Sequence, residues 1–433
     1  VRIGADSEDH TNFNPSVQVP QTVFPAITAT VPYPEASTIV VGNAFYEAAS
    51  HLPAGTQVIW GVNLRSVNLT AAHLEATAIA HAFASSALAD AGVALQAIEI
   101  GNEADLYGNG WTIEEYVGNW TVFANNVTAA ANAIMGEEVA LMGCAFAGSS
   151  HSTGSFSPQG ALDHGLLDSP AGSQIDLISQ HHYSGSFCTG SESILQDLMS
   201  KTGIRGNLSA FAPDIAAVHD QGLTYVLGET NSYSCHGAPG VSNTAGAALW
   251  GLDYALFATQ LGIARLYFHE GVGYKYNFVQ PVTLTRSILD GSPLAAPLPP
   301  HVQPLYYAAI VAAEAIGASG TTSVVELAVD NDHVTGYAFF EDGALARALF
   351  VNLRVFDGGA RGAVHVGIEG VECIMVVKRL SVPTANATEG LTWGGQTYET
   401  EDAMVQGGLQ TQTVDVSVGV DVHDTEVVML SFQ

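Results

Sequence analysis

Residues 97–103 read AIEIGNE, a short apolar run of β-type residues that ends in the polar pair Asn102 and Glu103. Burying a carboxylate at the end of such a run costs free energy, so its presence there suggests that the group has a function. Similar runs recur along the first two thirds of the chain, and helix-like segments separate them. This alternation is typical of parallel β–α–β units. The stretch therefore predicts a strand of a parallel sheet whose carboxyl end carries chemistry.

The chain contains seven segments of this kind. Helix-like segments lie between them and after the last one. The predicted strands cover residues 1–4, 57–64, 97–103, 139–146, 175–183, 224–230 and 264–271. The predicted helices cover residues 71–91, 114–135, 191–201, 207–220, 243–262 and 304–318. Each helix is long enough to cross back over a sheet. The order predicts a (β/α)8 barrel, the TIM-barrel fold, although one of its eight strands is missing from the count.

The pattern changes at about residue 321 to short strands without helices, separated by glycine and aspartate. This texture predicts an antiparallel β-sandwich. We therefore divide the chain into a catalytic barrel at residues 1–318 and a β-sandwich domain at residues 319–433.

The composition excludes several classes of partner. The chain has 12 Lys and Arg residues against 42 Asp and Glu residues, and its formal net charge is −30. Such a field repels nucleic acid and anionic membrane surfaces, so we expect neither as a partner. No apolar run reaches the roughly 20 residues that a membrane span needs.

Five Asn-X-Ser/Thr sequons predict N-glycosylation, and together with the acidic charge and only four cysteines they indicate a secreted protein. The asparagines are Asn68, Asn119, Asn126, Asn207 and Asn386.

Two carboxylates stand at the predicted strand ends, where catalytic groups of parallel barrels lie. Glu103 and Glu229 end two strands that are not neighbours, so their side chains can face each other across the barrel mouth. Two carboxylates about 5 to 5.5 Å apart suffice to cleave a glycosidic bond with retention of configuration. The alternative for each glutamate is a structural ion pair at the rim. Glu99 lies on the same face and deeper in the strand, and we interpret it as structural.

His181 and His182 are adjacent on one predicted strand and therefore point to opposite faces. They cannot chelate one metal ion together, so we expect one to line the site and the other to pack. The chain has no zinc-protease helix, GxSxG elbow, P-loop or dinucleotide motif. We predict neither a metal nor a cofactor.

Several stretches taken in order resemble glycoside hydrolase family 79, the β-glucuronidases related to heparanase, within the clan of (β/α)8 retaining glycosidases. They are VRIGADSEDH (1–10), WGVNL (60–64), IEIGNEADLYG (98–108), QHHY (180–183), GETNSYSCHGAPGVSNT (228–244) and LTWGGQTYET (391–400). The resemblance implies that Glu103 is the acid/base, that Asn102 binds a sugar hydroxyl and that Glu229 is the nucleophile.

The resemblance also implies a glucuronic acid whose carboxylate is held by tyrosine hydroxyls and backbone N–H groups. Tyrosines follow the predicted strand ends, and the Gly-bearing loop SCHGAPG can aim amides at an anion. Packing is the alternative role for each tyrosine. The predicted substrate-binding residues are Asn102, His182, Tyr183, Tyr233, Gly237, Tyr274 and Tyr276.

The leading interpretation is a retaining exo-β-glucuronidase that removes terminal glucuronic acid, with or without a 4-O-methyl group, from glycans or conjugates. A heparanase-like endo-β-glucuronidase, a glucosidase or xylanase of the same clan and an inactive carbohydrate-binding relative remain alternatives. Three lysines and nine arginines offer little charge for binding a long sulfated chain. A carbohydrate that bears glucuronic acid is the predicted partner, and the oligomeric state stays open.

The positions of the cysteines predict one disulfide. Cys188 and Cys235 each follow the end of a neighbouring catalytic strand by a few residues, in loops that meet on one face. We expect them to be bonded and to brace the substrate loops. Cys144 and Cys373 are expected to be buried free thiols.

The resemblance places residues 1–4 at the second barrel strand, so the first strand is the missing one. We expect the natural gene product to have an upstream segment that carries a signal peptide, some sandwich sequence and the first barrel strand. Unpaired N–H and C=O groups at open strand edges cost roughly 1 to 3 kcal/mol each when they are buried. We therefore expect the upstream segment to pair with these open edges. We also expect it to help form the sugar pocket.

Overall fold

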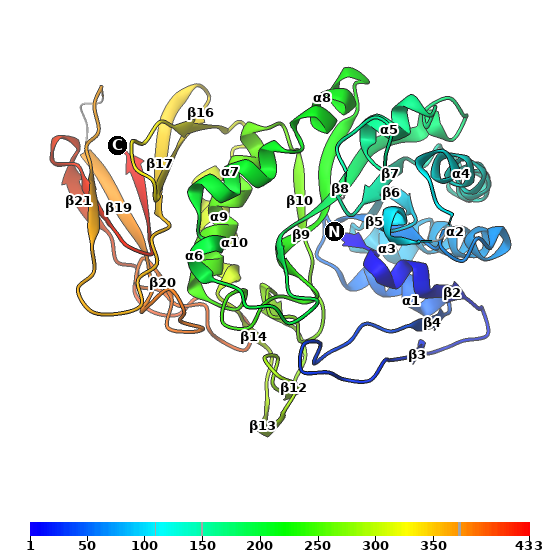
Figure 1. Ribbon diagram of the computed structural model, residues 1–433, viewed down its shortest axis with the longest axis horizontal. Helices are drawn as coiled ribbons and strands as arrows, with labels where there is room; N and C mark the ends of the chain where they lie inside the picture. The colour runs from blue at the N-terminus through cyan, green and yellow to red at the C-terminus, as the bar shows by residue number, and fades with distance from the viewer. Residues whose placement is uncertain (109, 149, 371–373) are drawn as a thin grey trace.

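The computed structural model describes residues 1–433 except residues 109, 149 and 371–373. A parallel sheet surrounded by helices lies at one end of the molecule, and antiparallel strands from the C-terminal part of the chain lie at the other (Figure 1). No helix in the described part is long and apolar enough to cross a membrane.

The parallel sheet has seven strands in the order β1-β5-β6-β7-β8-β9-β10. They are β1 (Arg2–Ile3), β5 (Gln57–Val62), β6 (Ala94–Ile100), β7 (Leu141–Phe146), β8 (Ile175–Ser186), β9 (Thr224–Ser234) and β10 (Arg265–Phe268). Each neighbouring pair runs parallel. The carboxyl ends of all seven strands therefore meet on one face, and the predicted barrel is confirmed.

The helices connect successive strands and cover the sheet. They are α1 (Asn43–Glu47), α2 (Leu69–Phe83), α3 (Ser86–Ala91), α4 (Ile113–Met135), α5 (Pro158–Asp163), α6 (Leu195–Leu198), α7 (Lys201–Ser209), α8 (Ala212–Asp220), α9 (Ala245–Gln260) and α10 (Leu305–Ile316). Short 3-10 turns lie at η1 (Ala5–His10), η2 (Ala48–His51), η3 (Ala104–Leu106), η4 (Gly172–Gln174) and η5 (Val416–Val418).

Local sequence explains where α4 begins and ends. The Thr112 side chain accepts a hydrogen bond from the Glu115 backbone N–H, and the Glu115 carboxylate accepts one from the Thr112 N–H. This reciprocal capping box satisfies two backbone donors at the start of the helix. Gly136 ends the helix in a left-handed conformation at φ 75°, which costs glycine little. Helix α4 thereby packs behind β6, the strand that leads to Glu103.

The sheet is nearly closed. Strands β1 and β10 form its two edges, and no described strand pairs with both of them. A cavity of about 1520 Å³ lies at this edge and is lined by apolar groups such as Ile3, Trp60 and Leu266 as well as by Glu229. The expected eighth strand stays a prediction.

The C-terminal part of the chain forms antiparallel sheets, as predicted. The larger sheet contains β15 (Ser323–Leu327), β16 (Val334–Glu341), β17 (Ala344–Asn352), β23 (Glu426–Phe432), β19 (Ile374–Ser381), β20 (Thr392–Trp393) and β21 (Gln412–Asp415). A second sheet pairs β18 (Ala363–Val366) with β22 (Val420–His423). Buried residues from both sheets, including Phe350, Val422 and Leu430, form one apolar cluster between them. The predicted boundary at residue 318 lies between α10 and β15.

The barrel and the sandwich pack directly on each other. Arg205 of α7 forms ion pairs with Asp253 of α9 and with Glu326 of β15, and its Nη2 atom donates to the Tyr337 hydroxyl at 2.8 Å. The Lys201 ammonium donates to three backbone carbonyl oxygens of the sandwich. Charged side chains of the barrel therefore contribute to the domain interface.

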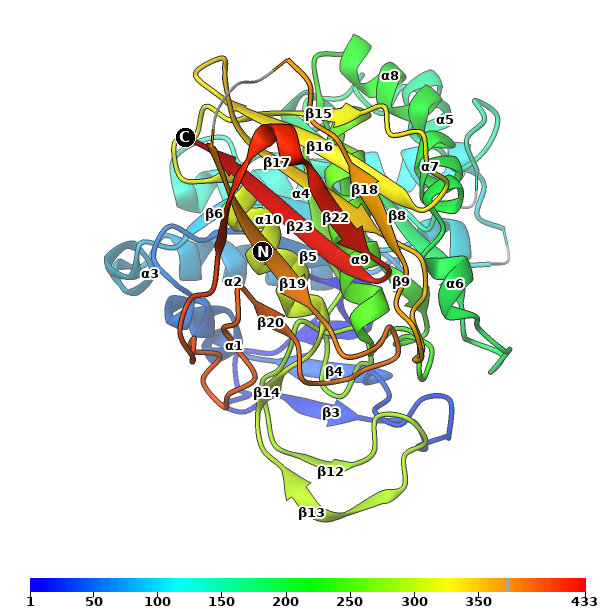
Figure 2. The same ribbon diagram turned by 90° about the vertical axis from the view of Figure 1, so that its left-hand side faces the viewer.

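The sequence pattern did not predict a small sheet beside the barrel. Its strands are β2 (Thr11–Phe13), β4 (Thr38–Val41) and β3 (Gln21–Val23), and residues 24–37 between β3 and β4 form a segment that we call the strap. The strap lies beside the hairpin of β12 (Leu284–Arg286) and β13 (Pro293–Leu298), at the bottom of Figures 1 and 2. The Tyr33 hydroxyl donates to the Arg286 carbonyl oxygen and accepts from the Arg286 N–H. A further short pair joins β11 (Val279–Gln280) and β14 (His301–Val302).

Candidate active site

Glu103 lies just past the carboxyl end of β6, in an unusual backbone conformation. Its φ is 50°, and its backbone N–H donates to the Ala145 carbonyl oxygen of β7 at 2.8 Å. Cys144 and Ala145, at the end of β7, also have left-handed backbones. Such conformations cost about 1 to 3 kcal/mol each for residues other than glycine and concentrate at functional sites. The Glu103 side chain reaches into the barrel mouth, where its Oε1 atom lies 2.8 Å from Nδ1 of His181.

Glu229 of β9 is the second carboxylate, and three side chains hold it. Its Oε1 atom accepts from the Tyr183 hydroxyl at 2.7 Å and lies 3.2 Å from Nδ1 of His269. Its Oε2 atom accepts from Nη1 of Arg2 at 3.0 Å. Burial alone would raise the pKa of Glu229, but the charges of His269, His181 and Arg2 hold that pKa well below its ordinary value. Glu229 is therefore an ionised, oriented carboxylate.

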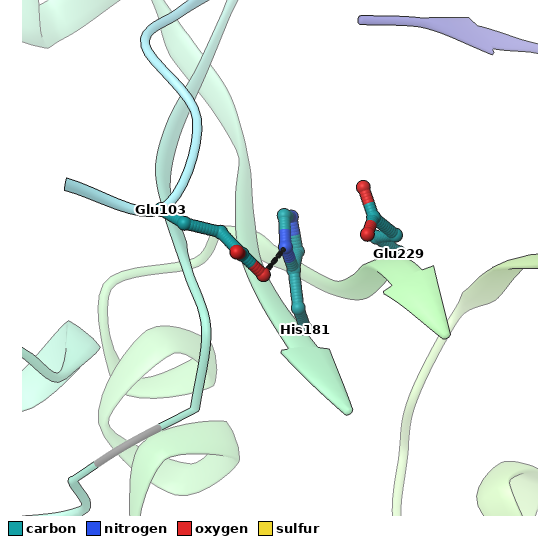
Figure 3. Close-up of side chains that lie close together, drawn as sticks. All are labelled: Glu103, His181 and Glu229. Carbon is teal, nitrogen blue, oxygen red and sulfur yellow. Dashed lines mark hydrogen bonds and ion pairs between the residues drawn. The ribbon is translucent and has the colours of Figure 1, made fainter. Parts of the chain in front are cut away.

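The two predicted catalytic glutamates face each other. One oxygen of Glu103, one ring nitrogen of His181 and one oxygen of Glu229 lie within 4.8 Å of one another. Figure 3 shows His181 between the two carboxylates, with its hydrogen bond to Glu103. The same three atoms are of the kinds that bind metal ions, but Arg2, Tyr183 and His269 already engage the oxygens of Glu229. The absence of a metal stays a prediction.

Arg2 of β1 connects the nucleophile position to Asn102, and sequence reasoning missed it. Its guanidinium donates to Glu99 through Nε at 2.8 Å and to the Asn102 side-chain oxygen through Nη2 at 2.7 Å. Although burial opposes the charge, Glu99, Glu229 and Glu8 raise the pKa of Arg2. Glu99 is fully buried and pairs with Arg2. The bond to Arg2 orients the Asn102 side chain through its oxygen, so the amide nitrogen does not contact the arginine.

Tyr183 and Tyr276 of the predicted substrate-binding set lie close to Glu229 and His269. Their hydroxyl oxygens are 2.8 Å and 3.2 Å from Nδ1 of His269. The Tyr183 proton goes to Glu229, so the hydrogen bond between Tyr183 and His269 uses the Nδ1 proton of the imidazole. His269, which sequence reasoning noticed only as a strand-end residue, therefore orients both Tyr183 and Glu229.

Tyr274, Tyr233 and Gly237 all contact groups of the chain itself. The Tyr274 hydroxyl donates to Glu35 Oε1 at 2.6 Å. The Tyr233 ring packs against Gly185. The Gly237 N–H donates to the Tyr233 carbonyl oxygen at 3.1 Å, because this loop turns tightly, with Gly237 at φ 88°. That amide is therefore not available for an anion, which corrects the predicted role of Gly237.

His182 also departs from its predicted place. Its Nδ1 atom lies 2.8 Å from the Tyr254 hydroxyl, and its ring stacks on Tyr254 and contacts the edge of Phe211. His181 instead reaches Glu103. The two histidines take opposite faces of β8, as expected, but the structure places His181 in the site and His182 in the packing layer.

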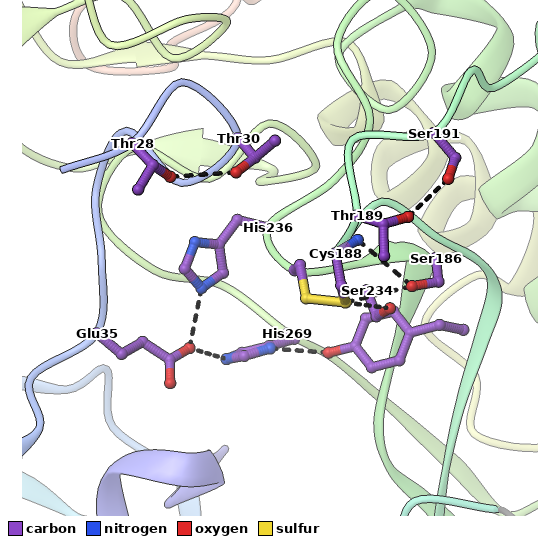
Figure 4. Close-up of a disulfide and its surroundings, with 12 residues drawn as sticks. Thr28, Thr30, Glu35, Ser186, Cys188, Thr189, Ser191, Ser234, His236 and His269 are labelled. Atoms are coloured by element: carbon purple, nitrogen blue, oxygen red, sulfur yellow. Dashed lines mark hydrogen bonds and ion pairs between the residues drawn. A yellow bond between two sulfur atoms is a disulfide. The ribbon is translucent and has the colours of Figure 1, made fainter. Parts of the chain in front are cut away.

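The disulfide joins Cys188 and Cys235, the pairing that the sequence predicts, with 5.1 Å between the Cα atoms. Figure 4 shows it close to Glu35, His236 and His269. It links the loops after β8 and β9. Cys144 is a buried free thiol, and Cys373 lies outside the described residues.

The predicted glycosylation asparagines differ in exposure. Asn68, Asn207 and Asn386 are exposed, whereas Asn119 and Asn126 are half-buried on α4. Glycosylation stays a prediction at all five positions.

Comparisons with known proteins agree with this geometry. Residues 336–429 match the family model of the glycosyl hydrolase family 79 C-terminal beta domain. A β-glucuronidase of Aspergillus niger is 28% identical over 465 residues, which cover 99% of this chain and 80% of that protein. A β-glucuronidase of Neurospora crassa is 24% identical over 475 residues, which cover 96% of this chain and 80% of that protein.

A solved structure shares the fold along nearly the whole chain. It is a 4-O-α-L-rhamnosyl-β-D-glucuronidase from Fusarium oxysporum, with a TM-score of 0.79 and 24% sequence identity. The match covers 99% of this chain and 87% of that one.

The parallel barrel, the facing carboxylates at its mouth and the β-sandwich behind it define a glycoside hydrolase. The C-terminal domain matches glycoside hydrolase family 79, and the chain is similar to two β-glucuronidases along nearly its whole length. Both findings support the family that the sequence motifs indicate.

Proposed function

We propose that this chain is a retaining exo-β-glucuronidase, with Glu103 as acid/base and Glu229 as nucleophile. The observation that carries the proposal is the pair of facing carboxylates within 4.8 Å, one of which is held ionised. Two β-glucuronidases that match over nearly the whole chain support the sugar specificity.

The spacing of the carboxylates favours retention. Retaining glycosidases hold their carboxyl groups about 5 to 5.5 Å apart, whereas inverting enzymes leave about 6.5 to 9.5 Å for a water molecule. One oxygen of Glu103 and one of Glu229 lie within 4.8 Å of each other, which is closer to the retaining spacing than to the inverting one. Direct attack by Glu229 is therefore the favoured route.

In the first step, Glu229 attacks the anomeric carbon while Glu103 donates its proton to the departing glycosidic oxygen. Tyr183, His269 and Arg2 fix the direction of the Glu229 oxygens before the reaction, so little reorganisation is needed. In the second step, Glu103 removes a proton from water, the water attacks the glycosyl-enzyme, and Glu229 leaves as a carboxylate.

His181 suits the role of orienting Glu103. It is fully buried, and in the described part of the chain its Nε2 atom has no hydrogen-bond partner. With the imidazole proton on Nδ1, His181 donates to Glu103 Oε1 and leaves the other oxygen to carry the transferable proton.

Two further features support the setting of the proposed activity. The disulfide between Cys188 and Cys235 is typical of an oxidising compartment and supports an extracellular enzyme, and the five sequons support a glycoprotein. The formal net charge of −30 disfavours long sulfated chains, which supports exo action on terminal glucuronic acid over endo cleavage.

One assay tests sugar specificity and stereochemistry together. A panel of aryl β-glycosides is incubated with the protein, and the released anomer is followed by NMR. We expect hydrolysis of the glucuronide, little hydrolysis of the glucoside and xyloside, and initial release of the β-anomer. Initial release of the α-anomer would contradict retention, and a preference for the glucoside would contradict the proposed specificity.

A further inference from the structure

The strap delivers one carboxylate into the active site. Residues 24–29 are exposed, but Glu35, near the end of the strap, is half-buried and lines the same cavity as Glu229. Figure 4 shows the Glu35 carboxylate between the rings of His236 and His269. No sequence pattern marks Glu35, because it lies in a loop rich in proline and threonine.

Three side chains of the barrel point at this carboxylate. The Tyr274 hydroxyl donates to Glu35 Oε1 at 2.6 Å, and Nε2 of His236 lies 3.2 Å from the same oxygen. Nε2 of His269 lies 3.9 Å away. The His236 and Tyr274 rings are stacked with centroids 3.8 Å apart, so these two groups form a rigid pair. We call Tyr274, His236 and His269 the donor triad.

The donor triad is built for an anion. Burial would raise the pKa of Glu35, but His236, His269 and Tyr274 lower it below its ordinary value. Burial also opposes the charge on His269, yet Glu229 and Glu35 raise the pKa of that imidazole. The arrangement thus stabilises one negative charge in the cavity that Glu229 also lines, and His269 lies against both carboxylates.

Other cations near the site are already engaged. Arg2 is held by Glu99, Glu229 and Asn102. The Lys275 ammonium is buried and donates to the Thr30 carbonyl oxygen of the strap at 3.4 Å, and burial lowers its pKa to about 8.

We propose that Glu35 is an internal carboxylate that occupies the donor triad in the free enzyme, and that the carboxylate of a uronic acid substrate displaces it. This inference rests on the proposed glucuronidase function. Two carboxylates cannot share one set of donors without strong repulsion. The strap is held near the site by side-chain contacts rather than by a backbone ladder with the barrel, so its release costs little compared with unfolding. Glu35 thus favours sugars whose carboxylate can displace it from the donor triad.

The test compares Glu35→Gln with the wild type in the binding of free glucuronate and of glucose. The glutamine keeps the shape of the side chain but neither repels the sugar carboxylate nor holds the donors as strongly. We expect the Kd for glucuronate to fall by about tenfold while the Kd for glucose stays unchanged. Glu47→Gln, which removes one exposed negative charge on α1, is the matched control and should leave both constants as in the wild type.

If Glu35 merely positions the triad for the substrate, the same variant binds glucuronate more weakly, and that result overturns the proposal. Equal affinity of the variant and the wild type also overturns it. Hydrogen exchange on the wild type provides a measurement that needs no variant. Glucuronate should speed exchange of the backbone amides in residues 24–37, and glucose should not. Slower exchange with glucuronate contradicts displacement of the strap.

A third measurement separates this proposal from the proposed function. Glu35→Ala empties the donor triad, so sodium acetate should raise the Tm of this variant more than that of the wild type. If acetate has this effect but the wild type neither binds nor hydrolyses glucuronides, the internal carboxylate site stands and the glucuronidase function is wrong. If acetate has no selective effect, the donor triad does not bind a free carboxylate and the proposal is wrong.

Discussion

Around Glu229, the roles of single residues follow from which atoms carry protons. Tyr183 and Arg2 donate to its two oxygens, and His269 lies beside the same carboxylate. Donors of this kind stabilise the ionised form, and they restrict the direction from which the carboxylate attacks. Glu103 has instead one imidazole neighbour and remains partly exposed, as an acid that must exchange protons with water requires.

The first prediction concerns the division of roles between the two glutamates. Glu229→Ala should lower kcat/KM by at least about a thousandfold on every glucuronide, because no group replaces the nucleophile. Glu103→Ala should lose far less activity on 4-nitrophenyl glucuronide, whose leaving group needs no proton, than on an alkyl glucuronide. Steady-state kinetics on the two substrates measure the difference. Equal losses for both variants on both substrates would argue against the assignment.

The second prediction concerns pH. His269 is one of the charges that lower the pKa of Glu229, so His269→Asn should raise that pKa. A raised pKa means that Glu229 becomes protonated at higher pH, and the acid limb of kcat/KM should move to higher pH. The measurement is the pH profile on 4-nitrophenyl glucuronide, with the exposed His51→Asn as control. An acid limb that stays in place or moves to lower pH would show that His269 does not act on Glu229.

At the scale of elements, the loops that follow β8 and β9 determine the shape of the site. The disulfide joins these loops, and the donor triad takes His236 from the residue after Cys235. The strap approaches from the opposite side and contacts the same loop through Glu35. The rim of the pocket is thus braced covalently on one side and held by side-chain contacts on the other.

The third prediction is that the disulfide stabilises the folded chain. The bonded cysteines are 47 residues apart, and closing a loop of that length in the unfolded chain corresponds to about 4 kcal/mol in the chain-entropy model. The double variant Cys188→Ser with Cys235→Ser should therefore unfold at lower urea concentration. A reductant should destabilise the wild type to a similar degree and leave the double variant unchanged. If the reductant also lowered the stability of the double variant against urea, it would be acting at another site than this disulfide.

At the scale of the whole molecule, the sandwich supports the side of the barrel formed by α7 and α9. Helix α9 is buried along almost its entire length, between the parallel sheet and the C-terminal sheets. Arg205 pairs with Asp253 within the barrel and reaches across the interface to Glu326 and Tyr337. The catalytic barrel and the β-sandwich should therefore unfold together rather than as independent units.

The fourth prediction tests this coupling. Arg205→Ala leaves the buried Asp253 carboxylate without its cation, and the free energy of unfolding should fall by about 3 kcal/mol. Because Arg205 does not touch the site, kcat/KM at low temperature should remain close to that of the wild type. Thermal unfolding and kinetics measure the two effects, with the exposed Arg354→Ala as control. Unchanged stability would mean that the ion pairs do not hold the domains together.

The sequence by itself determined the strands, the two glutamates and the disulfide. Each is a local property, because apolar runs form strands, and the carboxyl ends of parallel strands collect on one face. Glu103, Cys188 and Cys235 follow such ends, and Glu229 lies within β9, so their proximity could be predicted without knowing the path of the chain.

Only the tertiary structure decided which residues contact and orient these groups. The contacts of Glu229 with Arg2 and of His236 with Glu35 span 227 and 201 residues, and no periodicity links such distant positions. Alternation along a strand says that His181 and His182 face opposite sides, but it does not say which side meets the site. The packing of β8 decided this, because His182 stacks on Tyr254 and contacts Phe211, whereas His181 reaches Glu103. A register shift in the pairing of β8 with β9 places Glu229 opposite His181.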